Sequence, residues 1–220
     1  MLVCEIVENT FGAVPVIDHA GNLAFHVSGG ATAQGPGPAG SVAEARTRLE
    51  REMGVAPGRT EYLTQVHSAR VVEATGSGWG ARSDPAEEAD ALVSPTGEDP
   101  LAIMVADCLP VVFASRPRGG AELTGPTAVA HAGRRGLLDG VLEAAVDRLR
   151  GAGAGDATGE IEAWVGPGIC GRCYEVPADL REEVAVDVPV ARSVTRSGTP
   201  ALDVAGGVLE QLAPYVADLQ

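Results

Sequence analysis

Three side chains that commonly bind transition metals stand at the ends of short apolar runs: His67, Cys108 and His131. The runs have the length of strands and are bounded by turn residues, so we expect the three side chains to lie where strands end. A sheet holds such side chains in place, and the loops that follow can surround a ligand. Two imidazoles and one thiolate suit zinc and leave a fourth position for water. The set therefore predicts a catalytic zinc site.

Two other interpretations of these residues remain open. Each side chain could have its own local role, with satisfied histidines in turns and a buried cysteine, because spacing along the chain does not show that residues meet in space. Alternatively, Cys108 could be a nucleophile activated by His131 in a hydrolase without metal. A metal assay on protein purified without added metal separates most of these possibilities.

Other local motifs are absent or incomplete. Gly35, Gly37 and Gly40 have dinucleotide-binding spacing, but Pro36 and Pro38 interrupt them and no predicted strand precedes them. We interpret this segment as a loop. The sequence contains no phosphate loop, no His-Glu-x-x-His helix and no zinc nucleobase deaminase signature.

Cys170 and Cys173 form a Cys-x-x-Cys, a spacing found in redox pairs and in zinc knuckles. The sequence has no second pair to complete four thiolate ligands. A redox pair is expected to open a helix, whereas Gly171 lies inside this pair. We therefore interpret the two cysteines as thiols of a turn.

The elements that must position these residues are those of an α/β protein. Helical spacing predicts a helix over Ser41–Met53, with Ser41 and Glu44 as a capping box and Gly54 as its stop. A second apolar stripe predicts a helix from about Leu137 to Leu149. Five strands of a mixed, largely buried sheet are expected at Tyr62–Val66, Leu101–Val105, Val111–Ala114, Ala128–Ala130 and Ile161–Val165.

Composition is consistent with one folded unit. The 220 residues are 45% hydrophobic, which is enough for a core, and we expect residues 1–220 to form a single domain. The chain shows no internal repeat. Surface loops rich in glycine and proline are predicted at Gly29–Gly40, Gly76–Gly80, Arg116–Gly120 and Gly151–Gly159.

The charge and the cysteine content limit which partners and which cellular location we expect. The net charge is −14, and all 16 basic residues are arginines, which disfavours nucleic-acid binding but leaves room for a small anion where arginines converge. No apolar run suggests a membrane span or a signal segment. The four cysteines are too few and too scattered for a secreted disulfide framework. We expect a cytoplasmic protein, and the oligomeric state is left open.

The residues around the three candidate ligands carry a more specific signal. The chain contains the following ordered blocks: Thr64-Gln-Val-His67, Ala89-Asp-Ala-Leu-Val93, Val105-Ala-Asp-Cys-Leu-Pro110, Val129-Ala-His-Ala-Gly-Arg-Arg-Gly136, Gly166-Pro-Gly-Ile169 and Cys173-Tyr-Glu-Val176. In this order they resemble the laccase-domain family, also called YfiH-like, whose members are known as polyphenol oxidases and as purine nucleoside phosphorylases. The match covers roughly Ser41 to Leu212.

The resemblance implies a fold, a metal and a reaction. Its fold is a single-domain α/β/β/α layered structure with a mixed sheet. Family members bind zinc through residues that correspond to His67, Cys108 and His131, the same three found from the residue types. The implied activity is phosphorolysis of adenosine, inosine, guanosine and methylthioadenosine to base and sugar 1-phosphate, together with hydrolytic deamination of adenosine.

Further site residues follow from this implied chemistry. Zinc would activate water for deamination, and Asp107 is either the proton carrier or a group that orients a ligand histidine. For phosphorolysis, Arg46 on the first predicted helix and Arg135 in the His-Ala-Gly block would hold phosphate, unless they are solvated side chains. The purine nucleosides and phosphate are thus the expected partners.

Copper-dependent phenol oxidation is the alternative activity, as the older family name implies. Multicopper oxidases need many histidines, and this chain has four, so we expect any copper activity to be adventitious. A metal-binding module with weakened activity is a further alternative. The chain departs from the family pattern at Ser28, where members carry Arg, at Arg134, where they carry Trp, and at the C-terminal paired arginines, which are not found before Gln220.

Overall fold

The structure of the protein is a computed structural model. It describes residues 2–3, 18–19, 23–27, 39–79, 87–117, 124–153 and 159–219.

The centre of the molecule is a mixed sheet of six strands in the order β12-β9-β7-β8-β5-β4. Strand β7 pairs antiparallel with both β8 and β9, and β8 pairs antiparallel with β5. The outer pairs, β4 with β5 and β12 with β9, are parallel. The six strands span Val71–Glu73 (β4), Ala91–Ser94 (β5), Leu109–Pro117 (β7), Thr127–Ala132 (β8), Gly159–Val165 (β9) and Asp218–Leu219 (β12).

Smaller strand pairs and five α-helices complete the described structure. Three two-stranded sheets pair β1 with β2, β3 with β6 and β10 with β11. Their strands are Leu2–Val3 (β1), Asp18–His19 (β2), Leu23–Val27 (β3), Leu101–Val105 (β6), Arg192–Val194 (β10) and Pro200–Leu202 (β11). The helices are Ala39–Glu52 (α1), Arg134–Asp139 (α2), Val141–Gly151 (α3), Ala178–Asp187 (α4) and Val204–Leu212 (α5), with a 3₁₀ turn at Pro189–Ala191.

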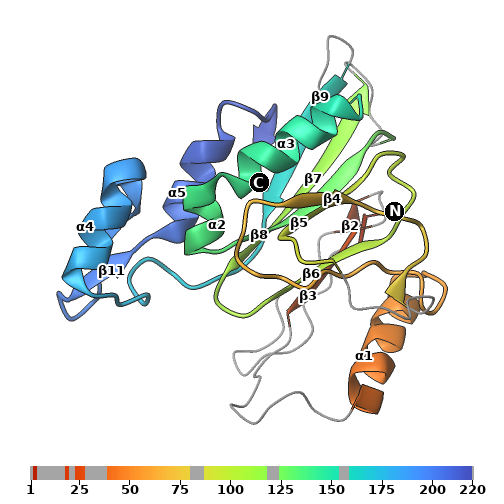
Figure 1. Cartoon of the computed structure of the whole chain (residues 1–220), viewed down its shortest axis with the longest axis horizontal. Helices are drawn as coiled ribbons and strands as arrows, with labels where there is room; N and C mark the ends of the chain where they lie inside the picture. Colours follow the sequence, from red (N-terminus) through yellow and green to blue (C-terminus); the bar gives the residue numbers. More distant parts are fainter. Residues whose placement is uncertain are drawn as a thin grey trace.

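The elements form layers, as Figure 1 shows. Helices α2, α3 and α5 lie along one face of the six-stranded sheet, the β3–β6 pair lies on the other side, and α1 lies beyond that pair. This arrangement confirms the predicted α/β class with a mixed sheet.

Successive side chains of the central strands point to opposite faces of the sheet, and both faces are buried, which explains why the apolar runs of these strands are nearly continuous. In β7, Val111 and Phe113 pack into the core on the helix side, whereas Val112 and Ala114 pack into a second core. The second core also contains Leu101 and other buried residues of β6. Both faces of the sheet are therefore buried, and neither needs polar residues.

Most predicted strands are confirmed, but Tyr62–Val66 is wrong. The structure has β6 at the predicted bounds and longer forms of the other three. Between residues 62 and 66 the chain makes only an isolated bridge, from Thr64 to Glu88, and the preceding Glu61 bridges Leu101. The two bridges, three residues apart, thus lead to different partners, β6 for Glu61 and the segment before β5 for Thr64, so the chain here forms no continuous ladder.

The two predicted helices also need correction. Helix α1 begins at Ala39, so Ser41 lies inside the first turn and not at a capping position. Alanine favours the helix at position 39 but Gly40 in the same turn disfavours it, so residue propensity alone does not set this boundary. The predicted helix Leu137–Leu149 is divided into α2 and α3 at Gly140, whose φ of 85° ends one helix and begins the next.

The predicted loops are confirmed in part. Residues 76–79 form a turn region, but residues 39–40 belong to α1, residues 116–117 and Gly159 to strands, and Gly151 to α3. Residues 29–38, 80, 118–120 and 154–158 of the predicted loops lie outside the described residues. Among the helices of the described ranges, none combines the length and apolar character needed to cross a bilayer.

Candidate metal centre

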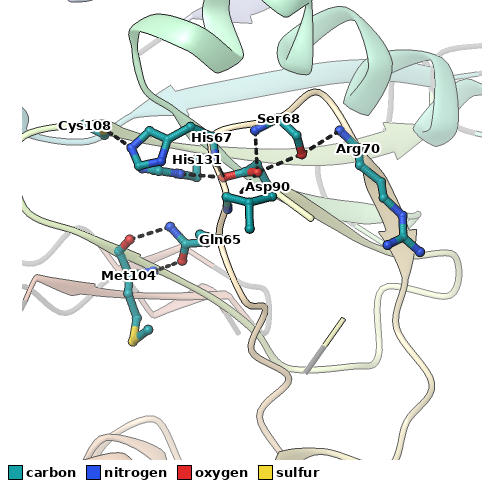
Figure 2. Close-up of polar contacts among 9 residues, drawn as sticks. Gln65, His67, Ser68, Arg70, Asp90, Met104, Cys108 and His131 are labelled. Atoms are coloured by element: carbon teal, nitrogen blue, oxygen red, sulfur yellow. Dashed lines mark hydrogen bonds and ion pairs between the residues drawn. The ribbon is translucent and has the colours of Figure 1, made fainter. Parts of the chain in front are cut away.

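The structure brings His67, Cys108 and His131 together, although they come from three separate segments (Figure 2). His131 lies in β8, one residue before the strand ends, and Cys108 lies in the bend between β6 and β7. His67 lies in the bend before β4. Their potential ligand atoms all lie within 4.8 Å of one another. The fold therefore brings these three residues together, which their spacing along the chain could not show.

The backbone of His67 has a left-handed conformation, with φ at 61°. It stands alone in this respect among the described residues other than glycine. Left-handed conformations are costly for residues with a Cβ and persist only where neighbouring contacts hold them. The conformation turns the imidazole toward Cys108, whose Sγ lies 3.7 Å from His67 Nε2.

Asp90 supplies the contacts that hold this bend. Its fully buried carboxylate accepts hydrogen bonds from the backbone amides of Val66, His67 and Ser68, at 3.2, 2.9 and 2.6 Å. The Ser68 hydroxyl donates a further bond of 2.9 Å. Burial alone would raise the pKa of the Asp90 carboxyl, but hydrogen bonds from His131, Ser68 and His67 lower it below its ordinary value. Asp90 is therefore ionised.

The same carboxylate orients His131. Asp90 Oδ1 lies 2.8 Å from His131 Nδ1, and the Asp90 carbonyl accepts a bond of 2.7 Å from the His131 amide. Burial and the nearby His67 lower the pKa of His131 below its ordinary value, although Asp90 opposes this shift. A neutral His131 that donates Nδ1–H to Asp90 keeps the lone pair of Nε2 free, which is the form that binds metal.

Gln65 fixes the chain just before His67. Its side-chain amide donates to the Met104 carbonyl at 2.7 Å, and its side-chain oxygen accepts from the Met104 amide at 2.9 Å. Figure 2 shows this double contact beside the histidines. Because Met104 belongs to β6 and Cys108 follows β6, the contact ties the segments of two candidate ligands together.

Gly133 leaves the space that the ligand side chains occupy. A Cβ at this position would lie 2.7 Å from Cys108 Sγ and 2.9 Å from His67 Cδ2. Real Cβ atoms do not approach so closely, so any larger residue would displace one or both side chains. The backbone φ of Gly133 is −83°, which suits any residue. Glycine is required here for space and not for conformation.

These residues fit a zinc ion. A tetrahedral zinc keeps nitrogen and sulfur ligands about 3.3–3.6 Å apart, and Cys108 Sγ and His67 Nε2, at 3.7 Å, are already close to this spacing, while all three atoms lie within 4.8 Å of one another. Burial and the charges of Asp107 and Asp90 raise the pKa of the Cys108 thiol. A cation at the site would offset those two negative charges and favour the thiolate.

The other predicted site residues are not part of this group of three ligands. Asp107 precedes Cys108 and is exposed, and its carbonyl accepts a bond of 2.8 Å from the Ile169 amide. Arg135 is exposed in the first turn of α2, just after Gly133. Arg46 lies on α1, apart from α2 in Figure 1, with its guanidinium 4.0 Å from the centre of the Tyr62 ring.

Sequence reasoning missed the roles of Asp90, Gln65 and Gly133. All three stand in the blocks that carried the family resemblance, and no local rule gives them a function. The available signal was an acidic residue just before an apolar stretch, Ala91–Val93, which the structure shows to be part of β5. Only the pairing of Ala91 with Ala130 reveals that Asp90 lies opposite His131.

Comparisons with known proteins show the family to which the chain belongs. A family model described as "Multi-copper polyphenol oxidoreductase laccase" matches residues 21–215. The chain belongs to this family. The laccase family protein "Purine nucleoside phosphorylase SCO2081" of Streptomyces coelicolor is 42% identical over 184 residues, covering 84% of this chain and 70% of the relative. "Purine nucleoside phosphorylase YfiH" of Escherichia coli is 38% identical over 158 residues, 71% of this chain and 58% of that protein.

A solved structure supports the fold of this laccase family chain. The crystal structure of Neisseria meningitidis protein NMB0706 superposes with a TM-score of 0.64 at 26% identity, covering 86% of this chain and 72% of that one. The predicted laccase-domain resemblance is thereby confirmed.

The first prediction concerns the space at Gly133. Gly133→Ala should weaken zinc binding by at least about tenfold, because the added methyl displaces Cys108 or His67 from the cluster. Stability should change by less than about 1 kcal/mol, since the displaced atoms are side-chain ends. Zinc affinity is measured by competition with a chromophoric chelator, and stability by urea unfolding. Gly151→Ala is the control, because nothing lies within 4 Å of its Cβ. Wild-type zinc affinity in Gly133→Ala would contradict the assignment.

The second prediction separates Asp90 from Asp107. In Asp90→Asn the amide places a donor against backbone donors, so zinc affinity should fall by about 10–100-fold and unfolding free energy by about 3 kcal/mol. Asp107→Asn is the matched control and should keep both values. The same chelator competition and urea unfolding measure both variants. Equal loss of zinc affinity in the two variants would instead show that Asp107 orients a ligand histidine.

Proposed function

We propose that this chain is a zinc-dependent enzyme that acts on purine nucleosides, by phosphorolysis to base and sugar 1-phosphate and by deamination of adenosine. The observation that carries the proposal is the cluster of His67, Cys108 and His131 with Asp90 behind it. Two relatives that share most of this chain bear the name purine nucleoside phosphorylase. Adenosine, inosine, guanosine and methylthioadenosine are the proposed substrates.

The ligand set favours zinc over copper. One thiolate and two imidazoles with one open position are typical of catalytic zinc. Multicopper oxidation needs several copper centres, and this chain has four histidines in total. Within the described ranges, His67, Cys108 and His131 are the one group of three or more potential ligands. A copper-dependent phenol oxidase is therefore the weaker candidate.

The residues of the chain have distinct parts in the proposed reaction. A zinc ion held by His67, Cys108 and His131 supplies Lewis-acid catalysis when bound. Asp90 holds His131 in the tautomer that presents Nε2, and holds the His67 backbone in the conformation that turns its ring inward. Asp107 is exposed beside Cys108 and is proposed to carry the proton that deamination transfers.

Phosphate is proposed to bind at an arginine beside the cluster. Arg135 lies two residues after Gly133, in the first turn of α2, and is exposed, so its guanidinium can reach an anion. Arg46 stacks on Tyr62 and lies 5.7 Å from the centre of the Trp79 ring. This stacking gives Arg46 a packing role, and we propose Arg135 as the main phosphate contact.

A metal-free hydrolase has less support. The contact that the Cys108 thiol makes is with His67 Nε2, at 3.7 Å, whereas the proposed activating residue is His131. Burial, Asp107 and Asp90 raise the pKa of Cys108, which opposes formation of a free thiolate nucleophile.

The third prediction tests the reaction itself. Zinc-loaded protein incubated with adenosine should release adenine and ribose 1-phosphate when phosphate is present, and inosine when it is absent. Chromatography identifies the products. Cys108→Ala should lose zinc and both activities while its circular dichroism spectrum stays native, because the core depends on apolar burial. Zinc binding without either product would mean a metal-binding module, and phenol oxidation only with copper would favour the oxidase.

The fourth prediction tests the phosphate contact. Arg135→Ala should raise the phosphate requirement and slow phosphorolysis by about ten- to a hundredfold, the equivalent of about 1.5–3 kcal/mol for a charge-assisted contact. Deamination needs only water and should survive. Arg46→Ala is the comparison, and a larger effect there would place phosphate near α1. Initial rates at several phosphate concentrations give the measurement. Equal losses of both reactions in either variant would show that the arginine shapes the pocket generally.

A further inference from the structure

Two exposed cysteines outside the candidate metal centre lie within contact distance of each other. Cys170 and Cys173 are free thiols, and their Sγ atoms are 2.8 Å apart. Neither residue has a part in the proposed nucleoside reaction. The predicted turn is confirmed, since residues 171–173 form a turn after β9.

The turn geometry suits a disulfide. The Cys173 amide donates to the Cys170 carbonyl at 2.8 Å, which closes a four-residue turn. Such turns bring their end Cα atoms within about 7 Å, and disulfides join Cα atoms about 4.4–6.8 Å apart. The two thiols can therefore bond without a large backbone movement.

The surrounding structure holds this turn in place. A Cβ on Gly171 would lie 2.5 Å from Asp203 Cβ, so the turn packs directly against the residue that caps α5. Before the turn, the Ile169 amide donates to the Asp107 carbonyl at 2.8 Å. After the turn, the Leu202 amide donates to the Tyr174 carbonyl at 3.1 Å. Both ends are fixed, so little entropy is lost when the sulfurs join.

The two thiols differ in reactivity. The hydrogen bond with Cys173, the backbone amide of Arg172 and the charge of Arg196 lower the pKa of the Cys170 thiol. The same hydrogen bond raises the pKa of Cys173. An exposed thiol of lowered pKa beside a second thiol is the arrangement in which one sulfur attacks and the other resolves. No further potential metal ligand joins the pair in the described part of the chain.

We propose that Cys170 and Cys173 form a reversible dithiol–disulfide site that reacts with low-molecular-weight disulfides. The Cys170 thiolate attacks one sulfur of the reagent, whose S–S bond breaks, and half of the reagent leaves as a thiolate that takes up the proton lost by Cys170. Cys173 then loses its proton and attacks the Cys170 sulfur, which releases the second half as a thiol. Two protein thiols are oxidised to one disulfide, and one reagent disulfide is reduced to two thiols.

A natural cleavage site makes the test direct. Arg172 lies between the two cysteines, and trypsin divides this region into residues 151–172 and 173–181, each with one cysteine. The full-length, zinc-loaded protein is treated with oxidised glutathione, alkylated, and digested without reduction. We expect mass spectrometry to find these two peptides linked by a disulfide. Dithiothreitol should separate them and restore two alkylatable thiols.

Single substitutions assign the two steps. Cys173→Ser should accumulate a stable glutathione adduct on Cys170, because the resolving thiol is gone. Cys170→Ser should form no linked peptides, because the attacking thiol is gone. Melting temperature monitors folding of both variants, and the wild-type peptide map needs no variant. Absence of the linked peptides, with persistent glutathione on both cysteines of the wild-type protein, would overturn the proposal. A glutathione adduct on Cys173 of Cys170→Ser, with none on Cys170 of Cys173→Ser, would overturn the order of the two steps.

Discussion

Asp90, the residue before β5, is buried away from water. Its carboxylate instead accepts hydrogen bonds from two segments that are distant in sequence, the bend at His67 and the ring of His131. An unpaired buried carboxylate would cost several kcal/mol, so its ionisation depends on the bend around His67 and on the ring of His131. The dependence is mutual. The bend has its left-handed residue because the carboxylate holds it, and the imidazole has one tautomer because the carboxylate accepts a hydrogen bond from its Nδ1–H.

The layered architecture makes this arrangement possible. Strands β5 and β8 are antiparallel neighbours, and their register sets Asp90 opposite His131. Strand β6 belongs to the second layer and leads to Cys108, while the Gln65 amide joins that layer to the segment before His67. The cluster therefore forms where the two sheets meet, and it requires both of them.

The sequence could predict what depends on local pattern and on residue type. The run Leu101–Val105 is a strand because its apolar residues pair along one neighbour, and His67, Cys108 and His131 stand out by their chemistry. The segment Tyr62–Val66, which also carries Thr64 and Gln65, changes partner within a few residues, and no periodicity predicts that change. Gly140 divides an uninterrupted apolar stripe through its backbone conformation alone. The part of Asp90 needs a strand register, and that is a property of the whole fold.

The left-handed backbone of His67 sets stability against function at one position. Glycine or asparagine would adopt that conformation at lower cost, so selection for folding alone would not keep a histidine there. A substitution that relieves the strain would remove a ring that reaches Cys108. Variants selected only for thermal stability should therefore lose the histidine at this site. A family member that has lost activity should carry a residue there that adopts the left-handed conformation at lower cost.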